Sequence, residues 1–453
     1  MARPAAGGVT GLCVLSLLPV QPFAQGRDET GGRRTEITIG QNLEFSDNPD
    51  FVVDGDSQLV SLTSLGLTHE RSTGIDTLIF RIGGDLELGT GDLEGSAFQD
   101  PFVVLSFDRD VRHTRLGLSL RYRETDVSNP DSIGLTSLDD DILGSDVGTR
   151  QNLTLEISGA TGIEAPFGTD FNIRRDQLRF SDTTDNSLLD EDTDTIESGF
   201  TFRFSPRLSL RSFLRYTDRD VDGPGGVDRE TTILGATLDA EISDILSGNL
   251  TLSYDEIEFL GPTPSTTDGL SISGGLTRLT PNGSWGLTFS SDVAESGRRD
   301  QLNLRRDLEL KSGSLGLSFG VTHTEGLSTD PLYGIDWIRD LARGSISLSL
   351  SQSVTSDALA NEQIDTSLSL GVTQEVTDLS SLSLDASLRD SNELGALGID
   401  SRRIDVSLTY RRELERDWDM VGGYRYSHST QDGTTDRDSN TIFIGLERSL
   451  VWN

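Results

Sequence analysis

The chain is poor in several residue types, and each scarcity excludes a class of structure or chemistry. Its single cysteine, Cys13, lies in an N-terminal apolar segment. If that segment is removed, no thiol is left for disulfides, metal ligation or nucleophilic catalysis. After the first twenty residues no run approaches the roughly 20 apolar residues that a membrane helix needs. There is one lysine, Lys311, so arginine supplies nearly all of the positive charge.

Residues 1–24 have the pattern of a secretory signal peptide. Arg3 supplies a positive start, residues 12–20 are apolar, and Ala24 is a small residue at which cleavage before Gln25 can occur. We therefore expect three segments: a signal peptide at 1–24, a short periplasmic N-terminal segment at 25–34, and a single domain at 35–453.

The charge balance is strongly acidic. The formal charge of −36 becomes −37 when the signal segment, with its one arginine and no acid, is removed. Nonspecific nucleic-acid binding depends on lysine and arginine displacing counterions, so nucleic acid is excluded as a partner. An acidic surface of this kind suits solubility and divalent cations.

From about residue 35 onward apolar and polar residues alternate, which is the pattern of strands with one apolar face. Leu116, Leu118 and Leu120 alternate with Gly117 and Ser119 in one such run. The same alternation recurs at residues 151–159, 346–351 and 382–388. The whole set predicts about 22 strands, within a range of about 18–24, each of about 9–11 residues.

The connections between the expected strands alternate in length. Short ones are at 205–207, 280–283 and 311–314, and long acidic ones are at 126–148, 181–193, 218–230 and 390–401. Short turns on one side and long loops on the other are typical of membrane barrels. We therefore predict an all-β fold, a transmembrane antiparallel up-and-down β-barrel. We expect no plug domain, because residues 25–34 are too few for the folded plug that a TonB-type receptor carries.

Aromatic residues support the membrane assignment, because tyrosine and tryptophan collect at membrane interfaces. Those on the apolar register near strand ends are Tyr122, Tyr216, Tyr254, Tyr410, Trp418, Tyr424 and Tyr426. In the last segment Ile442, Ile444, Leu446, Leu450 and Trp452 share one register. That segment is similar to the C-terminal assembly signal of outer-membrane barrels.

Several strands end in Arg-Tyr followed by acidic loops, as at Arg215-Tyr216 and Arg425-Tyr426. With the signal peptide and the Ser/Leu/Arg strands, this resembles a proteobacterial outer-membrane β-barrel, and more narrowly the barrels associated with exopolysaccharide gene clusters. The resemblance implies the outer membrane of a Gram-negative bacterium. It also implies contact with outer-membrane lipid and lipopolysaccharide, and insertion by the barrel-assembly machinery. The oligomeric state is open.

The polar face offers one candidate site, a basic stripe in the lumen. Its members, on three strands of similar direction, are Arg121, Arg123, Arg174, Arg211 and Arg215. Alternate strands lie about 10 Å apart, so these arginines could contact an anionic solute or a sugar polymer. Alternatively they pair with inward carboxylates such as Glu156 and Glu197 and only fill a wet lumen.

For each of the remaining motifs, the surrounding sequence argues against a functional site. Asp218, Asp220 and Asp222 have the spacing of a calcium loop, but the twelfth position is Arg229 where a glutamate is needed. The acidic clusters at 139–141 and 190–192 are solvated loops or loose Ca²⁺ or Mg²⁺ sites. The Gly-x-Ser-x-Gly pattern at 316–320 lies in a strand, whereas a nucleophile elbow needs a strand, a turn and a helix. We predict no catalytic residue, no cofactor and no metal site.

Two functions follow from this architecture. The first is a pore or export channel, with a surface polysaccharide as a candidate cargo. The second is a structural or adhesive surface protein with a closed lumen. A barrel enzyme using His323 or His428 as a base is the least favoured, and we expect no enzymatic activity. A soluble secreted β protein stays open at this point.

Overall fold

The computed structural model describes residues 32–49, 51, 55–90, 97–127, 148–183, 188–223, 226–261, 264–356, 361–394, 400–415, 417–432 and 435–453. The expected signal peptide at 1–24 and the acidic cluster at 139–141 lie outside this part. Within it, no helix is long and apolar enough to cross a membrane.

The described residues form 22 strands. They are β1 (Arg33–Ser46), β2 (Gln58–Ser72), β3 (Asp76–Thr90), β4 (Ala97–Val111), β5 (Thr114–Asp126), β6 (Thr149–Thr161), β7 (Phe167–Ser181), β8 (Asp190–Ser205), β9 (Leu208–Asp222), β10 (Asp228–Ser243), β11 (Leu246–Leu260), β12 (Ser265–Thr280), β13 (Gly283–Ala294), β14 (Gly297–Leu310), β15 (Gly313–Thr324), β16 (Thr329–Leu341), β17 (Gly344–Ser356), β18 (Glu362–Thr377), β19 (Ser380–Glu393), β20 (Ser401–Glu415), β21 (Trp418–Gln431) and β22 (Arg437–Trp452).

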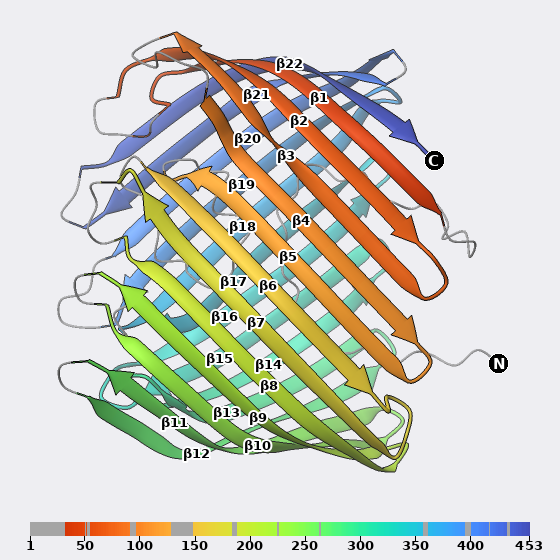
Figure 1. Ribbon diagram of the computed structural model, residues 1–453, viewed down its shortest axis with the longest axis vertical. Coiled ribbons are helices and arrows are strands. Elements are labelled where there is room, and N and C mark those ends of the chain that lie inside the picture. The colour runs from red at the N-terminus through yellow and green to blue at the C-terminus, as the bar shows by residue number, and fades with distance from the viewer. Residues whose placement is uncertain are drawn as a thin grey trace.

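Each strand pairs antiparallel with the next, and the last closes on the first. Thr35 of β1 lies opposite Trp452 of β22, and the pairing runs to Ser46 opposite Thr441. Figure 1 shows the strands winding obliquely around one barrel, with β22 beside β1. Closure satisfies the backbone hydrogen bonds of every strand edge, which a sheet in lipid requires. The predicted closed antiparallel barrel of about 22 strands is confirmed.

The strands are longer than the sequence pattern predicted. They span 12 to 16 residues, not 9–11, because they continue into segments that the pattern assigned to loops. β8 already begins at Asp190 and β9 ends only at Asp222. Acidic side chains there interrupt the apolar register but leave the backbone pairing intact, since Asp190 lies opposite Asp222. β1 likewise starts at Arg33, two residues before the expected boundary.

The two ends of the barrel differ in their connections. At the end where β1 starts and β22 stops, consecutive strands are joined by two to five residues. At the other end the connections range from two residues to the 22 residues between β5 and β6. Short turns face the periplasm in barrels of this kind, and longer loops face outward. This gives the barrel a periplasmic and an extracellular end.

The outer face carries the apolar half of the alternation. Leu116, Leu118 and Leu120 of β5 lie on it, and Leu118 stands between Phe107 of β4 and Ile157 of β6. Large apolar side chains such as Phe319 and Leu270 are two-thirds or more exposed at the protein surface, so lipid must cover them. A closed barrel with an apolar outer band is the form in which β-structure crosses a membrane. The chain is therefore a protein of the Gram-negative outer membrane.

Aromatic residues mark both edges of this band. The four tryptophans, Trp285, Trp337, Trp418 and Trp452, all lie near the periplasmic end. Arginines cover two of them, with the Arg306 and Arg448 guanidinium carbons 5.1 and 5.4 Å from the rings of Trp285 and Trp418.

Three tyrosines, Tyr122, Tyr254 and Tyr426, lie in the opposite, extracellular half. The Tyr254 hydroxyl donates to Asp268, and the Tyr122 and Tyr426 hydroxyls donate over 2.9 Å to Glu124 and Asp438. Each acceptor lies nearer to the extracellular end than the ring itself. The rings therefore face the apolar band while their hydroxyl groups reach the polar boundary.

Candidate functional site in the barrel lumen

The inner face is polar because every second residue of these strands is small and hydroxylated. On β17 the inward positions are Ser345, Ser347, Ser349, Ser351 and Ser353, which alternate with outward residues that are apolar except for Gln352. Their partners on β18 include Ser367 and Ser369. A strand pattern of this kind produces a wet interior and a lipid-facing exterior at once.

This chemistry extends over nine of the 22 strands. We call the inward positions at mid-height of β11–β19 the neutral wall. Apart from Arg305, Asp336, Asp385 and Arg389, these positions carry only hydroxyls, amides, glycines and one leucine. Its members are Thr251, Ser253, Ser273, Gly275, Thr288, Ser290, Gln301, Asn303, Ser318, Gly320, Leu332, Gly334, Ser349, Ser351, Ser367, Ser369 and Ser387.

The opposite side, on β5–β9, carries the predicted basic stripe together with carboxylates. Arg211 of β9 donates to Asp170 of β7 and, over 2.6 Å, to Glu197 of β8. Arg215 donates to the same Glu197 over 2.7 Å. Arg174 donates to Asp176 over 2.5 Å. These three arginines lie on the lumen face, and each is engaged by a carboxylate there.

Arg121 and Arg123 of β5 are arranged differently. Both are on the lumen face, where Arg121 lies opposite Thr154 and Arg123 opposite Asn152 of β6. Within the described residues neither forms an ion pair or a side-chain hydrogen bond, and Arg121 is exposed. Glu156, the other expected partner of the stripe, instead accepts a hydrogen bond of 2.6 Å from Asn172. Carboxylates therefore neutralise three arginines of the stripe. The other two, Arg121 and Arg123, could contact a solute.

The extracellular half of the lumen is crowded by side chains. Buried, inward-facing polar side chains surround it on strands from β1 to β21. They are Glu44, Ser46, Thr125, Arg150, Arg229, Asp255, Ser271, Thr322, Thr324, Gln363, Asp365, Ser391, Arg403, Ser427 and Ser429. Side chains of the connections at this end are buried with them, among them Phe51, Val127 and Leu189. We call this layer the upper constriction.

Two contacts hold the upper constriction together. Glu362, whose side chain is fully buried, accepts hydrogen bonds from Arg299 at 2.5 Å, Thr324 at 2.6 Å and Ser296 at 2.7 Å. Phe51, from the connection between β1 and β2, lies 5.1 Å from the guanidinium of Arg403 on β20. A buried carboxylate with three donors and an aromatic ring over an arginine are both costly to separate.

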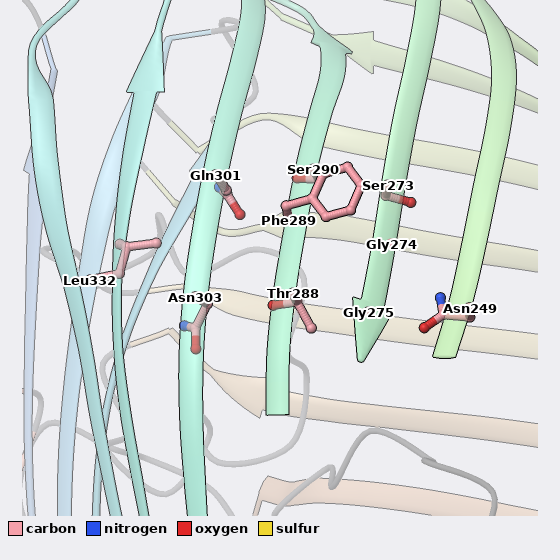
Figure 2. Close-up of a pocket in the computed structure, with 10 residues that line it drawn as sticks. All are labelled: Asn249, Ser273, Gly274, Gly275, Thr288, Phe289, Ser290, Gln301, Asn303 and Leu332. Atoms are coloured by element: carbon pink, nitrogen blue, oxygen red, sulfur yellow. The ribbon is translucent and has the colours of Figure 1, made fainter. Parts of the chain in front are cut away.

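Below this layer, on the neutral wall, the lumen surface has a cavity of about 260 Å³. Figure 2 shows the residues that line it on neighbouring strands, Asn249, Ser273, Thr288, Ser290, Gln301 and Asn303 among them. No charged side chain lines it. A second cavity nearer the periplasmic end is lined instead by charged groups, including Arg305, Asp307 and Asp336.

The other motifs take structural positions. Asp218, Asp220 and Asp222 lie on one face of strand β9. Asp192 of the cluster at 190–192 accepts a 2.5 Å hydrogen bond from Arg179. The described part of the chain contains no group of acidic, histidine or cysteine side chains placed to hold a metal ion.

Residues 316–320 lie within β15, as the sequence predicted. The two histidines considered as a base, His323 and His428, each have a side-chain partner. Nδ1 of His428 lies 2.7 Å from Asp438, and Nδ1 of His323 lies 3.0 Å from the Thr329 hydroxyl.

Sequence reasoning missed the upper constriction and the cavity. Glu362 and Arg299 are 63 residues apart, and Asn249 and Asn303 belong to strands separated by two others. The only signal that could have found the cavity is the run of amides and glycines at inward positions of β11–β14.

Comparison with known proteins supports the fold. No family model and no curated protein matches the chain. Among solved structures it is similar to a mutant ferric enterobactin receptor from Pseudomonas aeruginosa in complex with enterobactin. The two are 11% identical, with a TM-score of 0.56, over 93% of this chain and 82% of that one.

Two further structures agree. The FrpB iron transporter from Neisseria meningitidis is 9% identical with a TM-score of 0.58, over 94% of this chain and 82% of the other. The siderophore receptor PiuA from Acinetobacter baumannii is 11% identical with a TM-score of 0.56, over 92% and 82%. The narrower resemblance to exopolysaccharide-associated barrels gains no support from these matches. The chain is an outer-membrane β-barrel of 22 strands whose fold is similar to that of siderophore receptors.

Proposed function

We propose that this barrel carries a polar, uncharged, hydroxyl-rich solute across the outer membrane, as a pore or an export channel for a surface polysaccharide. The observation that carries the proposal is the neutral wall. Hydroxyl and amide side chains can exchange hydrogen bonds with a sugar at many heights, so no single strong site would hold it back.

The charges of the lumen favour an uncharged cargo. Arg174, Arg211 and Arg215 are engaged by carboxylates, so they attract an anionic solute less than free arginines would. Arg121 and Arg123 are the part of the stripe that could still contact an acidic group on a polymer. The excess of carboxylates over the whole chain opposes passage of a polyanion.

A second function is favoured by a different observation. The upper constriction covers the lumen near its extracellular end, as expected of a surface protein with a closed interior. The channel and the closed surface protein differ in one measurable property, which is whether a sugar crosses the barrel.

Swelling of proteoliposomes in sugar solutions tests the proposal. The mature chain, refolded and shown to be folded by its heat-modifiable gel mobility, is incorporated into liposomes loaded with dextran. Swelling in glucose and maltose that exceeds that of protein-free liposomes is the expected result. Folded protein that gives no swelling with either sugar would contradict a channel and support the closed surface protein.

A further inference from the structure

The cavity on the neutral wall brings together several polar side chains whose hydrogen-bonding capacity is free. Within the described residues, no hydrogen bond or ion pair involves any of its six polar side chains. They are Asn249, Ser273, Thr288, Ser290, Gln301 and Asn303. Some other neutral side chains of the lumen pair across strands, as Thr237 does with Thr251 and Ser351 with Ser367.

These six side chains form two adjacent cross-strand rows. In one row Asn249, Gly275, Thr288 and Asn303 lie successively opposite one another on β11–β14. In the next row Ser273, Ser290 and Gln301 do the same. Three steps between neighbouring strands span about 14 Å, and the rows are separated by about 7 Å along the strands. The cavity is therefore elongated across the wall, as a linear chain of sugar rings would require.

Glycines give the two terminal amides their positions. A Cβ atom at Gly275 would lie 2.7 Å from Oδ1 of Asn249, and one at Gly320 would lie 3.2 Å from Nδ2 of Asn303. The amide groups therefore occupy space that a side chain on the next strand would otherwise fill. Leu332, which is 7% exposed, adds an apolar surface at one edge.

The donors and acceptors fit one class of ligand. Each amide offers two donors and an acceptor, and each hydroxyl offers both functions, in the absence of charge. A sugar presents hydroxyl groups of the same dual character around rings whose C–H faces are apolar. A phosphate or carboxylate would find no cation among the residues that line the cavity, and the nearest inward arginines of β14, Arg299 and Arg305, are paired with Glu362 and Asp307.

We propose that this cavity is a binding subsite for a neutral, hydroxyl-rich oligosaccharide, held by Asn249, Asn303 and Gln301. The inference rests on the proposed function for its class of cargo, but binding can be measured without transport. At this subsite a sugar chain passing along the neutral wall would bind at one defined position.

Isothermal titration of the detergent-folded mature chain tests the subsite, with the neutral glucose oligomer maltohexaose as the probe. The test variant combines Asn249→Ala with Asn303→Ala. The matched control combines Asn42→Ala with Asn152→Ala, two inward amides on β1 and β6 that also lack hydrogen bonds within the described residues. Each lost hydrogen bond costs about 0.5–1.5 kcal/mol, so the test pair should weaken binding about tenfold and the control less than twofold.

The outcomes separate the subsite from the channel. Saturable binding that only the Asn249/Asn303 pair weakens supports the subsite, even if the proteoliposomes do not swell and the channel fails. No binding to the unsubstituted chain, or equal weakening by both pairs, overturns the subsite even where swelling shows a channel. Heat-modifiable mobility of every variant shows that a loss of binding is not a loss of folding.

Discussion

The assignment of outer and inner faces predicts opposite effects for two neighbouring residues of β5. Leu118 lies on the outer face between Phe107 and Ile157. It is four residues below Tyr122, about 13 Å along the strand, and so lies within the apolar band. Ser119 faces the lumen, with Glu156 directly opposite on β6.

An arginine has very different surroundings at these two positions. On the lipid face of a barrel it costs about 2–4 kcal/mol near the midplane, so Leu118→Arg should lower the free energy of unfolding by that amount. Ser119→Arg places the same side chain in water beside Glu156. Its effect should stay within about 0.5 kcal/mol, because an opposite charge across the strand pair offsets the added bulk.

Urea unfolding of the protein folded into lipid vesicles measures both effects, with the folded fraction read from heat-modifiable gel mobility. The reasoning predicts a clear shift of the midpoint for Leu118→Arg and little or none for Ser119→Arg. Equal tolerance of the two substitutions, or a larger effect at Ser119, would refute the register that defines lumen and lipid faces.

Three further predictions concern the upper constriction and the tryptophans near the periplasmic end. Glu362→Ala leaves the guanidinium of Arg299 without its carboxylate and should cost about 3 kcal/mol in urea unfolding; an unchanged midpoint would contradict this. Phe51→Ala removes a contact to Arg403 worth about 2 kcal/mol. This corresponds to about a thirtyfold rise in the equilibrium constant for detaching the β1–β2 connection from Arg403. It should raise the sugar flux in liposome swelling, and an unchanged flux would show that this contact does not restrict passage. Trp418→Ala should cost about 0.5–1 kcal/mol of unfolding free energy through the lost cation–π contact, and a wild-type midpoint would argue against that anchoring role.

Much of the fold could be predicted from local pattern. Alternation at Leu116, Leu118 and Leu120, and the two-residue turns such as that between β12 and β13, depend only on neighbours in sequence. These local patterns predicted the barrel class and the strand number. Strand length was underestimated at Asp190 and Asp222, because backbone pairing persists where side-chain alternation fails.

The candidate site was less accessible to sequence reasoning. Arg211 meets both Asp170 and Glu197 only because the register of three strands aligns them. The burial of Glu362 depends on connections that converge from distant parts of the chain. Such contacts follow from closure of the barrel, and no motif in the sequence predicts them.

Single-channel conductance of the refolded mature chain in a planar bilayer tests the central claim most directly, because it asks whether the polar lumen is continuous. The account predicts steady ion-current steps through the unsubstituted chain, which Phe51→Ala increases. Electrical silence from a protein that is folded by its heat-modifiable mobility, and that stays silent in Phe51→Ala, would contradict a channel and leave the closed surface protein.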